Sequence, residues 1–249
     1  MFAKLFSIIL ALMFLAATVQ AQEFVTDGLV AMWTLDKADI DGDIVKDASG
    51  NGNDATIMGS LDSVEGVIGE ALEFAGAAEN YVQIPALGAW EQASVECWVL
   101  TKDLAPTYQG IISTWQWTAG KVHFKFESSQ IQVDKNDGAK ITAPAEIDTW
   151  YHVIYTTETG ANELKLYVDG ELVAEGTSGA APENMDERRI GSEHDGRWLT
   201  GMVDEVRIYN RVLELEEVEQ NFATKLNSFA VTSTGKLAAS WGKIKSLED

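Results

Sequence analysis

The apolar positions of this chain alternate with polar ones in short runs, and Gly, Asn, Asp and Pro separate the runs. A period of two places the apolar side chains on one face of a strand, so the pattern predicts half-buried β-strands. We expect strands at 29–35, 55–58, 71–74, 81–84, 93–100, 110–115, 121–127, 130–133, 150–157, 163–168, 171–175, 189–192 and 202–209. Many short strands in one chain predict an all-β fold, a two-sheet antiparallel jelly-roll sandwich.

Two segments depart from the alternation. Asp169-Gly170 lies between two strand patterns, and a two-residue type I′ turn needs residues that accept positive φ, so we expect a tight hairpin there. From Leu213 to Ala223 the apolar residues fall on one helical stripe, with glutamates on the other side. This segment predicts one short C-terminal helix.

The N-terminus has the features of a targeting segment. A basic start precedes the apolar run 5–17, and Val19-Gln20-Ala21 fits a small-residue cleavage site. The run is too short for a comfortable membrane span. We therefore expect a secretory signal peptide at 1–21, an extracellular or periplasmic location, and no membrane insertion after cleavage; an uncleaved anchor is the alternative. The domain would span 22–223, followed by a tail of unknown role at 224–249.

Charge and cysteine content restrict the possible partners. The formal net charge is −21, and so acidic a surface repels nucleic acid and anionic lipid, so we expect no nucleic-acid partner. The single cysteine, Cys97, excludes a disulfide within the chain and alternates with Val95 and Val99, which favours a core position. An exported chain without a disulfide needs another stabiliser, and bound calcium would supply it.

Asp204 is a candidate ligand for such a cation. Strict alternation places it on one strand face with Val206 and Ile208, where a carboxylate is costly unless it is paired or binds a metal. The loop 47–54 is rich in Asp, Asn and Gly and could supply further oxygens. Ordinary turn chemistry, in which Asp and Asn cap their own backbone, explains the same loop. The neighbouring segment 39–43 lacks the rest of an EF-hand and is expected to be an exposed acidic loop.

Four segments in this order resemble a LamG-like jelly-roll domain of the concanavalin A-like lectin/glucanase superfamily. They are Trp33-Thr34-Leu35-Asp36, Asp47-Ala48-Ser49-Gly50-Asn51-Gly52-Asn53-Asp54, Tyr167-Val168-Asp169-Gly170 and Asp204-Glu205-Val206-Arg207-Ile208-Tyr209-Asn210-Arg211. The resemblance runs from about Gly28 to about Phe222. It implies that the first and last strands are neighbours and that calcium is often bound. On that basis the expected calcium ligands are Asp36, Asp47, Asn53 and Asp204.

Aromatic loops suggest where a ligand would bind. Sugar sites stack pyranose rings on aromatic faces and hydrogen-bond the hydroxyls with Asp, Asn and Arg. Two loop clusters have this composition, Tyr108-Gln109 with residues 114–117, and residues 194–198. In the resembled fold, loops beside the concave sheet commonly shape ligand sites. The candidate ligand-binding residues are Trp117, His194, Asp195, Arg197 and Trp198. The competing interpretation, that a given tryptophan belongs to the core, fits Trp33, Trp98 and Trp150.

The sequence argues against an enzyme. The superfamily includes laminarinase-type glycoside hydrolases, whose Glu-x-Asp-x-x-Glu strand holds the two carboxylates of retaining hydrolysis, and that motif is absent here. His123 and His152 alternate with apolar residues and are expected to be packed strand histidines. We therefore expect a secreted non-catalytic module that binds a carbohydrate or cell-surface glycoconjugate. A structural or adhesive module with a protein partner is the first alternative, and a glycoside hydrolase the second.

Overall fold

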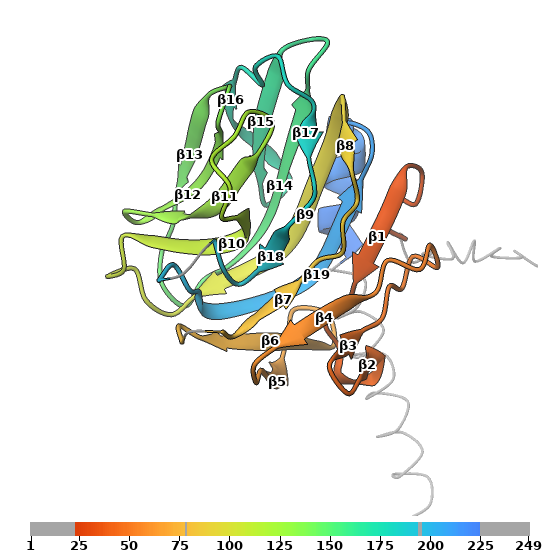
Figure 1. Cartoon of the computed structure of the whole chain (residues 1–249), viewed down its shortest axis with the longest axis vertical. Coiled ribbons are helices and arrows are strands. Elements are labelled where there is room, and N and C mark those ends of the chain that lie inside the picture. The colour runs from red at the N-terminus through yellow and green to blue at the C-terminus, as the bar shows by residue number, and fades with distance from the viewer. Residues whose placement is uncertain (1–22, 78, 194–195, 225–249) are drawn as a thin grey trace, which may run out of the picture.

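The computed structural model describes residues 23–77, 79–193 and 196–224. Two large antiparallel sheets pack face to face in this region (Figure 1). The predicted signal peptide and nearly all of the predicted tail lie outside the described residues, so those domain boundaries stay predictions. Within the described part of the chain, no helix is long and apolar enough to cross a membrane.

Sheet A has eight strands, all paired antiparallel. In spatial order they are β16 (Glu171–Gly176), β15 (Glu163–Val168), β14 (Trp150–Glu158), β9 (Gln92–Thr101), β19 (Thr200–Tyr209), β6 (Glu70–Ala75) and β5 (Asp62–Glu65), with β1 (Leu29–Trp33) paired to β19. The first and last strands of the sandwich are therefore neighbours, as the resemblance implied. They bring the segments around Asp36 and Asp204 to the same edge of the fold.

Sheet B has nine strands. Their order is β13 (Lys140–Pro144), β12 (Gln130–Lys135), β11 (Val122–Glu127), β10 (Tyr108–Thr114), β18 (Arg188–Ile190), β7 (Tyr81–Gln83), β4 (Ala55–Met58), β3 (Ile44–Val45) and β2 (Ile40–Asp41). A small third pair joins β8 (Ala89–Trp90) to β17 (Glu183–Asn184), and a 3-10 turn, η1 (Lys37–Asp39), follows β1.

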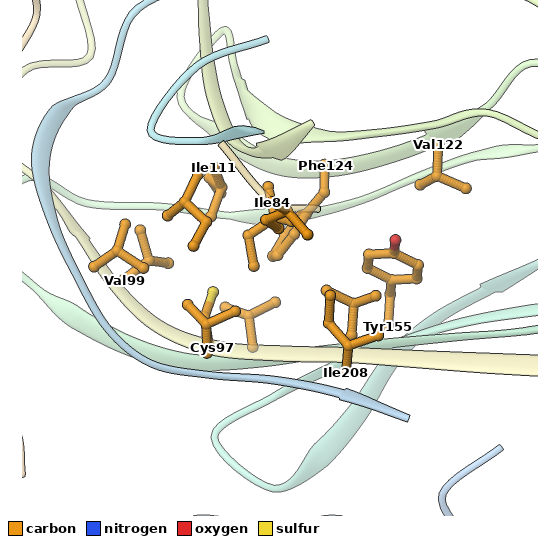
Figure 2. Close-up of a cluster of buried hydrophobic side chains, with 14 of the residues drawn as sticks. Ile84, Cys97, Val99, Ile111, Val122, Phe124, Tyr155 and Ile208 are labelled. Atoms are coloured by element: carbon orange, nitrogen blue, oxygen red, sulfur yellow. The ribbon is translucent and has the colours of Figure 1, made fainter. Parts of the chain in front are cut away.

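The core lies between the two sheets. Figure 2 shows Ile84, Ile111 and Phe124 of sheet B and its loops pointing toward Cys97 and Ile208 of sheet A, and all five side chains are buried. Cys97 is thus a core residue, as the alternation predicted. The period-two pattern produced this interior because each strand turns every second side chain inward.

The predicted two-sheet antiparallel sandwich is confirmed. Every predicted strand is present, and its ends lie within two residues of the expected ones. Helical residues 215–224 follow β19 as expected, and Asp169 and Gly170 both have positive φ in the β15–β16 turn. The prediction for residues 39–43 was wrong in part, because Ile40–Asp41 and Ile44–Val45 form a short hairpin instead of a loop. Its two-residue strands are too short to show an alternating pattern.

A β-bulge in β19 overturns the predicted face of Asp204. The register shifts between Asp204 and Arg207, and Glu205 has a φ of 53°. Val203 and Val206 both pack in the core although they are three residues apart, because the extra residue of a bulge reverses the alternation. Asp204 therefore lies opposite Trp98 on the outer face of sheet A and does not share the face of Val206.

The C-terminal helix covers a buried polar network on that outer face. The Glu96 carboxylate accepts hydrogen bonds from Arg207 Nη1 at 2.6 Å and from Asn221 Nδ2 at 2.6 Å, and His152 Nε2 lies 2.9 Å from it. All four side chains are buried. Burial alone would raise the pKa of Glu96, but the Arg207 guanidinium and the His152 contact outweigh it and hold the pKa at about 2.

We predict that Glu96 contributes stability with a defined pH dependence. Its pKa is about 2 in the folded protein against 4.5 ordinarily, so its contribution is complete above pH 4.5 and is lost as the pH falls toward 2. Glu96→Gln should lower the free energy of unfolding by about 3–5 kcal/mol at neutral pH, because Arg207 loses its buried partner. Urea unfolding from neutral to acidic pH should show the gap between wild type and variant closing below pH 4.5. A gap that stays constant would contradict this assignment.

Candidate functional site

The outer face of sheet B, the side turned away from sheet A, carries most of the aromatic and charged candidates. On β11, Phe124 points into the core, so the alternating residues His123 and Lys125 point outward. Both are nonetheless buried. Side chains from the neighbouring loops therefore cover this part of the face.

Trp117 forms the outermost layer of that cover. Its indole stacks on the His123 imidazole with ring centroids 3.8 Å apart and an interplanar angle of 18°, while 53% of the residue stays exposed. The Arg197 guanidinium lies 4.1 Å from the Tyr108 ring centroid and 5.6 Å from that of Trp117. The Lys125 ammonium lies 5.2 and 5.3 Å from the same two rings. We call Tyr108, Trp117, His123, Lys125 and Arg197 the first platform.

A buried carboxylate holds the first platform together. Glu193 Oε1 lies 2.8 Å from His123 Nδ1 and 3.5 Å from Lys125 Nζ, and its Oε2 accepts a hydrogen bond of 2.8 Å from Arg197 Nη1. Burial alone would raise the pKa of Glu193, but these three basic groups lower it to about 2. The carboxylate is therefore ionised at neutral pH and fixes the basic side chains beneath Trp117.

Backbone contacts place Arg197 directly over β10. Its carbonyl oxygen accepts hydrogen bonds from the backbone N–H groups of Gly110 and Glu193 at 3.1 and 3.2 Å. A Cβ atom at Gly110 would lie only 2.1 Å from the backbone of Ser192 and Glu193. Glycine at this position thus lets the segment that carries Glu193 and Arg197 rest on the sheet.

A second group of side chains lies on β7 and β18. The Tyr81 and Trp198 rings are nearly parallel, with centroids 6.2 Å apart, and the Arg189 guanidinium lies 4.3 Å from the Tyr81 centroid. All three are partly exposed. We call Tyr81, Arg189 and Trp198 the second platform. Arg197 and Trp198 are consecutive, so one segment supplies a side chain to each platform.

The structure brings three of the five predicted ligand-binding residues to one face. Trp117, Arg197 and Trp198 all lie over sheet B, and His194 and Asp195 fall outside the described residues. Sequence reasoning missed Tyr81, Lys125, Arg189 and Glu193. Tyr81 and Arg189 stand at outward positions of predicted strands, so an inspection of outward aromatic and basic residues would have found them.

Asp47 and Asn53 meet in the predicted turn. The Asp47 carboxylate accepts hydrogen bonds from the backbone N–H groups of Met32 (3.0 Å), Ser49 (2.9 Å) and Asn53 (2.9 Å). Burial raises the pKa of Asp47, but these bonds outweigh it, so the net shift is downward. The Asn53 amide donates to the Val30 carbonyl at 2.8 Å. These two residues tie the loop to β1.

Asp36 and Asp204 lie near each other at the start of β6. Asp204 Oδ2 accepts hydrogen bonds from the N–H groups of Val67 and Ile68 at 2.8 and 3.0 Å, and Asp36 Oδ1 accepts one from Glu70 at 2.5 Å. The Oδ1 of Asp204 is buried and has no hydrogen-bond partner in the described structure. Burial, with the nearby negative charges of Glu205 and Asp36, raises the pKa of Asp204 to about 8.

The four predicted calcium ligands thus form two pairs, Asp36 with Asp204 and Asp47 with Asn53. Among the residues that the structure describes, no group of three or more His, Cys, Asp or Glu side chains is arranged to hold a metal ion. Calcium also takes backbone carbonyl and amide oxygens, so the calcium site stays a prediction.

Comparison with known proteins identifies relatives of this fold. The family model of the concanavalin A-like lectin/glucanases superfamily matches residues 76–219, more than half of the chain. A sequence comparison with curated proteins found no match.

Three solved structures illustrate the similarity. Domain 4 of AbnA, an extracellular GH43 arabinanase from Geobacillus stearothermophilus solved with arabinotriose, has a TM-score of 0.63 at 18% identity, over 78% of this chain and 97% of that one. The binding domain of Paraclostridial Mosquitocidal Protein 1 has a TM-score of 0.63 at 15% identity, over 80% of this chain and 52% of that one. Trypanosoma rangeli sialidase in complex with sialic acid has a TM-score of 0.64 at 16% identity, over 81% of this chain and 34% of that one. The chain thus spans about half of the toxin domain and a third of the sialidase. At such identities the likeness establishes the fold alone.

We predict that Glu193→Gln destabilises the protein because three basic groups lose their buried counter-charge. The expected loss is about 3 kcal/mol, or roughly 6–12 °C in Tm for a domain of this size. The control is Glu163→Gln, which removes an exposed partner of Lys165 and should change Tm little. Thermal unfolding measures both variants. Equal Tm values for the two would refute the supporting role of Glu193.

Proposed function

Because this chain belongs to the concanavalin A-like lectin/glucanase superfamily, we propose that it is a secreted, non-catalytic module that binds a glycan on the outer face of sheet B. The observation that carries the proposal is the first platform. Trp117 presents a half-exposed indole held on His123, and Arg197 stands beside it. Such a surface can stack a sugar ring and hydrogen-bond its hydroxyls.

The similar structures support a glycan as the ligand. The arabinanase domain is described in complex with arabinotriose, and this chain spans almost all of that domain. The sialidase is described in complex with sialic acid. Support for export comes from the predicted signal peptide at residues 1–21 and from the arabinanase, which is described as extracellular.

The charges on the same face support a role without catalysis. Lys125 Nζ lies 3.4 Å from Glu127 Oε2 and 3.5 Å from Glu193 Oε1, so these two carboxylates flank one ammonium group. Despite burial, hydrogen bonds and nearby basic groups lower the pKa of both carboxyls. A glycoside hydrolase needs one carboxylic acid that stays protonated to supply a proton to the leaving group. Neither glutamate meets that requirement.

A protein-interaction module is the second candidate function. β16 is an edge strand of sheet A, and its Leu172 and Val173 side chains are 43% and 45% exposed. An exposed strand edge with apolar side chains can pair with a strand of a partner. The negative charges of the flanking Glu171 and Glu175 would repel an acidic partner strand. We therefore rank protein binding below glycan binding.

We propose further that a calcium ion binds at Asp36 and Asp204. The buried Oδ1 of Asp204 lacks a hydrogen-bond partner in the described residues, and an unpaired buried carboxylate oxygen is costly unless a cation compensates it. Asp36 is close enough for its charge to act on Asp204. Asp47 already satisfies its oxygens with backbone N–H groups, so the geometry favours Asp36 and Asp204 over Asp47 and Asn53. Calcium would supply a cross-link between the start of β6 and β19.

Glycan binding predicts a difference between two neighbouring tryptophans. Trp115 and Trp117 are 50% and 53% exposed, and Trp117 is the one stacked on His123. Trp117→Ala should weaken binding at least about tenfold, because an aromatic anchor contributes much of the binding energy. Trp115→Ala is the matched control and should bind as wild type. A glycan array followed by calorimetry on the best ligand measures both. If both variants lose affinity equally, or if neither loses affinity, the glycan does not bind at the first platform.

Calcium binding predicts a metal-dependent melting temperature. Calcium at 100 times its dissociation constant adds about 2.7 kcal/mol to the EDTA-treated protein, a shift of several degrees. Asp204→Asn keeps an acceptor for Val67 and Ile68 but removes the charge, so the shift should vanish. Asp62→Asn on exposed β5 is the control and should retain it. Absence of a shift in the wild type at millimolar calcium would remove the ion from the proposal.

A further inference from the structure

The second platform repeats the chemistry of the first at a different place on sheet B. Tyr81 offers an aromatic ring with the Arg189 guanidinium 4.3 Å from its centroid and the Trp198 ring 6.2 Å away. In the first platform the corresponding pair is Tyr108 with Arg197 at 4.1 Å. Each platform therefore combines a flat apolar surface with a guanidinium group that can donate hydrogen bonds. That combination suits the two sides of a sugar ring.

The two platforms adjoin at the neighbouring strands β10 and β18, whereas the His123–Trp117 stack of one and the Tyr81 ring of the other lie several strands apart on the same face. His123 beneath Trp117 is on β11, and Tyr81 is on β7, with β10 and β18 between them. Val82 of β7, Ile190 of β18 and Phe124 of β11 point into the core, so Tyr81, Arg189 and His123 point to the same outer side. Three strand-to-strand steps measure about 14 Å. This is longer than one pyranose ring and requires a ligand with several rings in a row.

One short segment joins the platforms. Arg197 and Trp198 are adjacent in the chain, and alternation along that segment sends one side chain to each platform. The Arg197 carbonyl is fixed by Gly110 and Glu193, and Trp198 forms a β-bridge with Ser192. The spacing between the platforms is thus set by backbone hydrogen bonds, and a ligand that contacts both meets a preorganised surface.

Charge on this face favours a neutral ligand. The cations of the first platform already have partners, because Glu193 contacts Lys125 and Arg197, and Glu127 contacts Lys125. The whole chain has a formal net charge of −21, which repels polyanions over the range of the Debye length. A carboxylated or sulfated chain would have to overcome that repulsion, and on the first platform it would meet cations that are already paired.

We propose that the second platform is a further glycan subsite, and that the ligand is a neutral linear oligosaccharide that crosses the strands of sheet B from Trp117 to Tyr81. This inference rests on the proposed function and adds the second subsite, the length of the ligand and its lack of charge. Tyr81 and Trp198 bind one part of the chain, and Trp117 binds another. A sugar too short to span both platforms binds at the first platform.

The test is calorimetric titration of the mature protein with neutral arabino-, xylo-, manno- and gluco-oligosaccharides, each from the monosaccharide upward. Affinity for the recognised series should rise steeply with length and level off once the chain spans both platforms, by about tenfold or more. Tyr81→Ala should remove this gain with length, whereas Trp117→Ala should weaken binding at every length. Leu172→Ala, exposed on sheet A, is the control and should behave as wild type.

The outcomes separate this inference from the proposed function. Binding that does not depend on length overturns the second subsite and leaves a single-platform glycan site. Tighter binding of oligogalacturonates than of neutral chains of equal length overturns the neutral ligand. If no glycan of any length binds, glycan binding itself fails and the second subsite fails with it. The length series uses the wild-type protein, so the test does not depend on whether a variant folds.

Discussion

The cost of burying charge governs this structure. Both faces of each sheet are covered in part, so carboxylates that alternation turns outward are still removed from water and need a partner. Glu96 is paired with Arg207 beneath the C-terminal helix, and Glu193 with Arg197 beneath Trp117. Glu183 is paired with Arg188 on the inner side of sheet B, where both side chains also hydrogen-bond the Tyr155 hydroxyl. Glu96 and Arg207 face each other across the β9–β19 ladder, and Asn221 joins the C-terminal helix to that pair.

The pair at Glu193 explains why the candidate site has a defined shape. The long side chains of Lys125 and Arg197 would otherwise sample many rotamers, and their ordering would reduce the affinity for a ligand. The buried carboxylate fixes them, and they in turn lie over the Tyr108 and Trp117 rings. A rigid aromatic surface on an acidic protein is suited to uncharged ligands with apolar faces.

The bulge in β19 has the opposite character, since it buries a carboxyl group whose oxygens the packing satisfies only in part. Glu205 takes a left-handed conformation that a non-glycine residue adopts only with strain. The same bulge turns Asp204 toward the outer face of sheet A and leaves its Oδ1 without a hydrogen bond in the described structure. A bound cation would compensate the unsatisfied Asp204 oxygen.

The sequence by itself determined most of the strands and the inward face of most of them, because period-two alternation is a property of neighbouring residues; it missed β5, β13 and the two-residue strands. It also identified Trp117, Arg197 and Trp198, since exposed aromatic and basic residues in polar loops stand out locally. Only the tertiary structure decided that Glu193 lies under Trp117, that Tyr81 and Arg189 extend the same face, and that Asp204 turns away from Val206. The positions of Glu193, Tyr81 and Arg189 depend on contacts between segments that are distant in the chain. The orientation of Asp204 depends on the one extra residue of the bulge. The alternating pattern that predicts a strand contains neither kind of information.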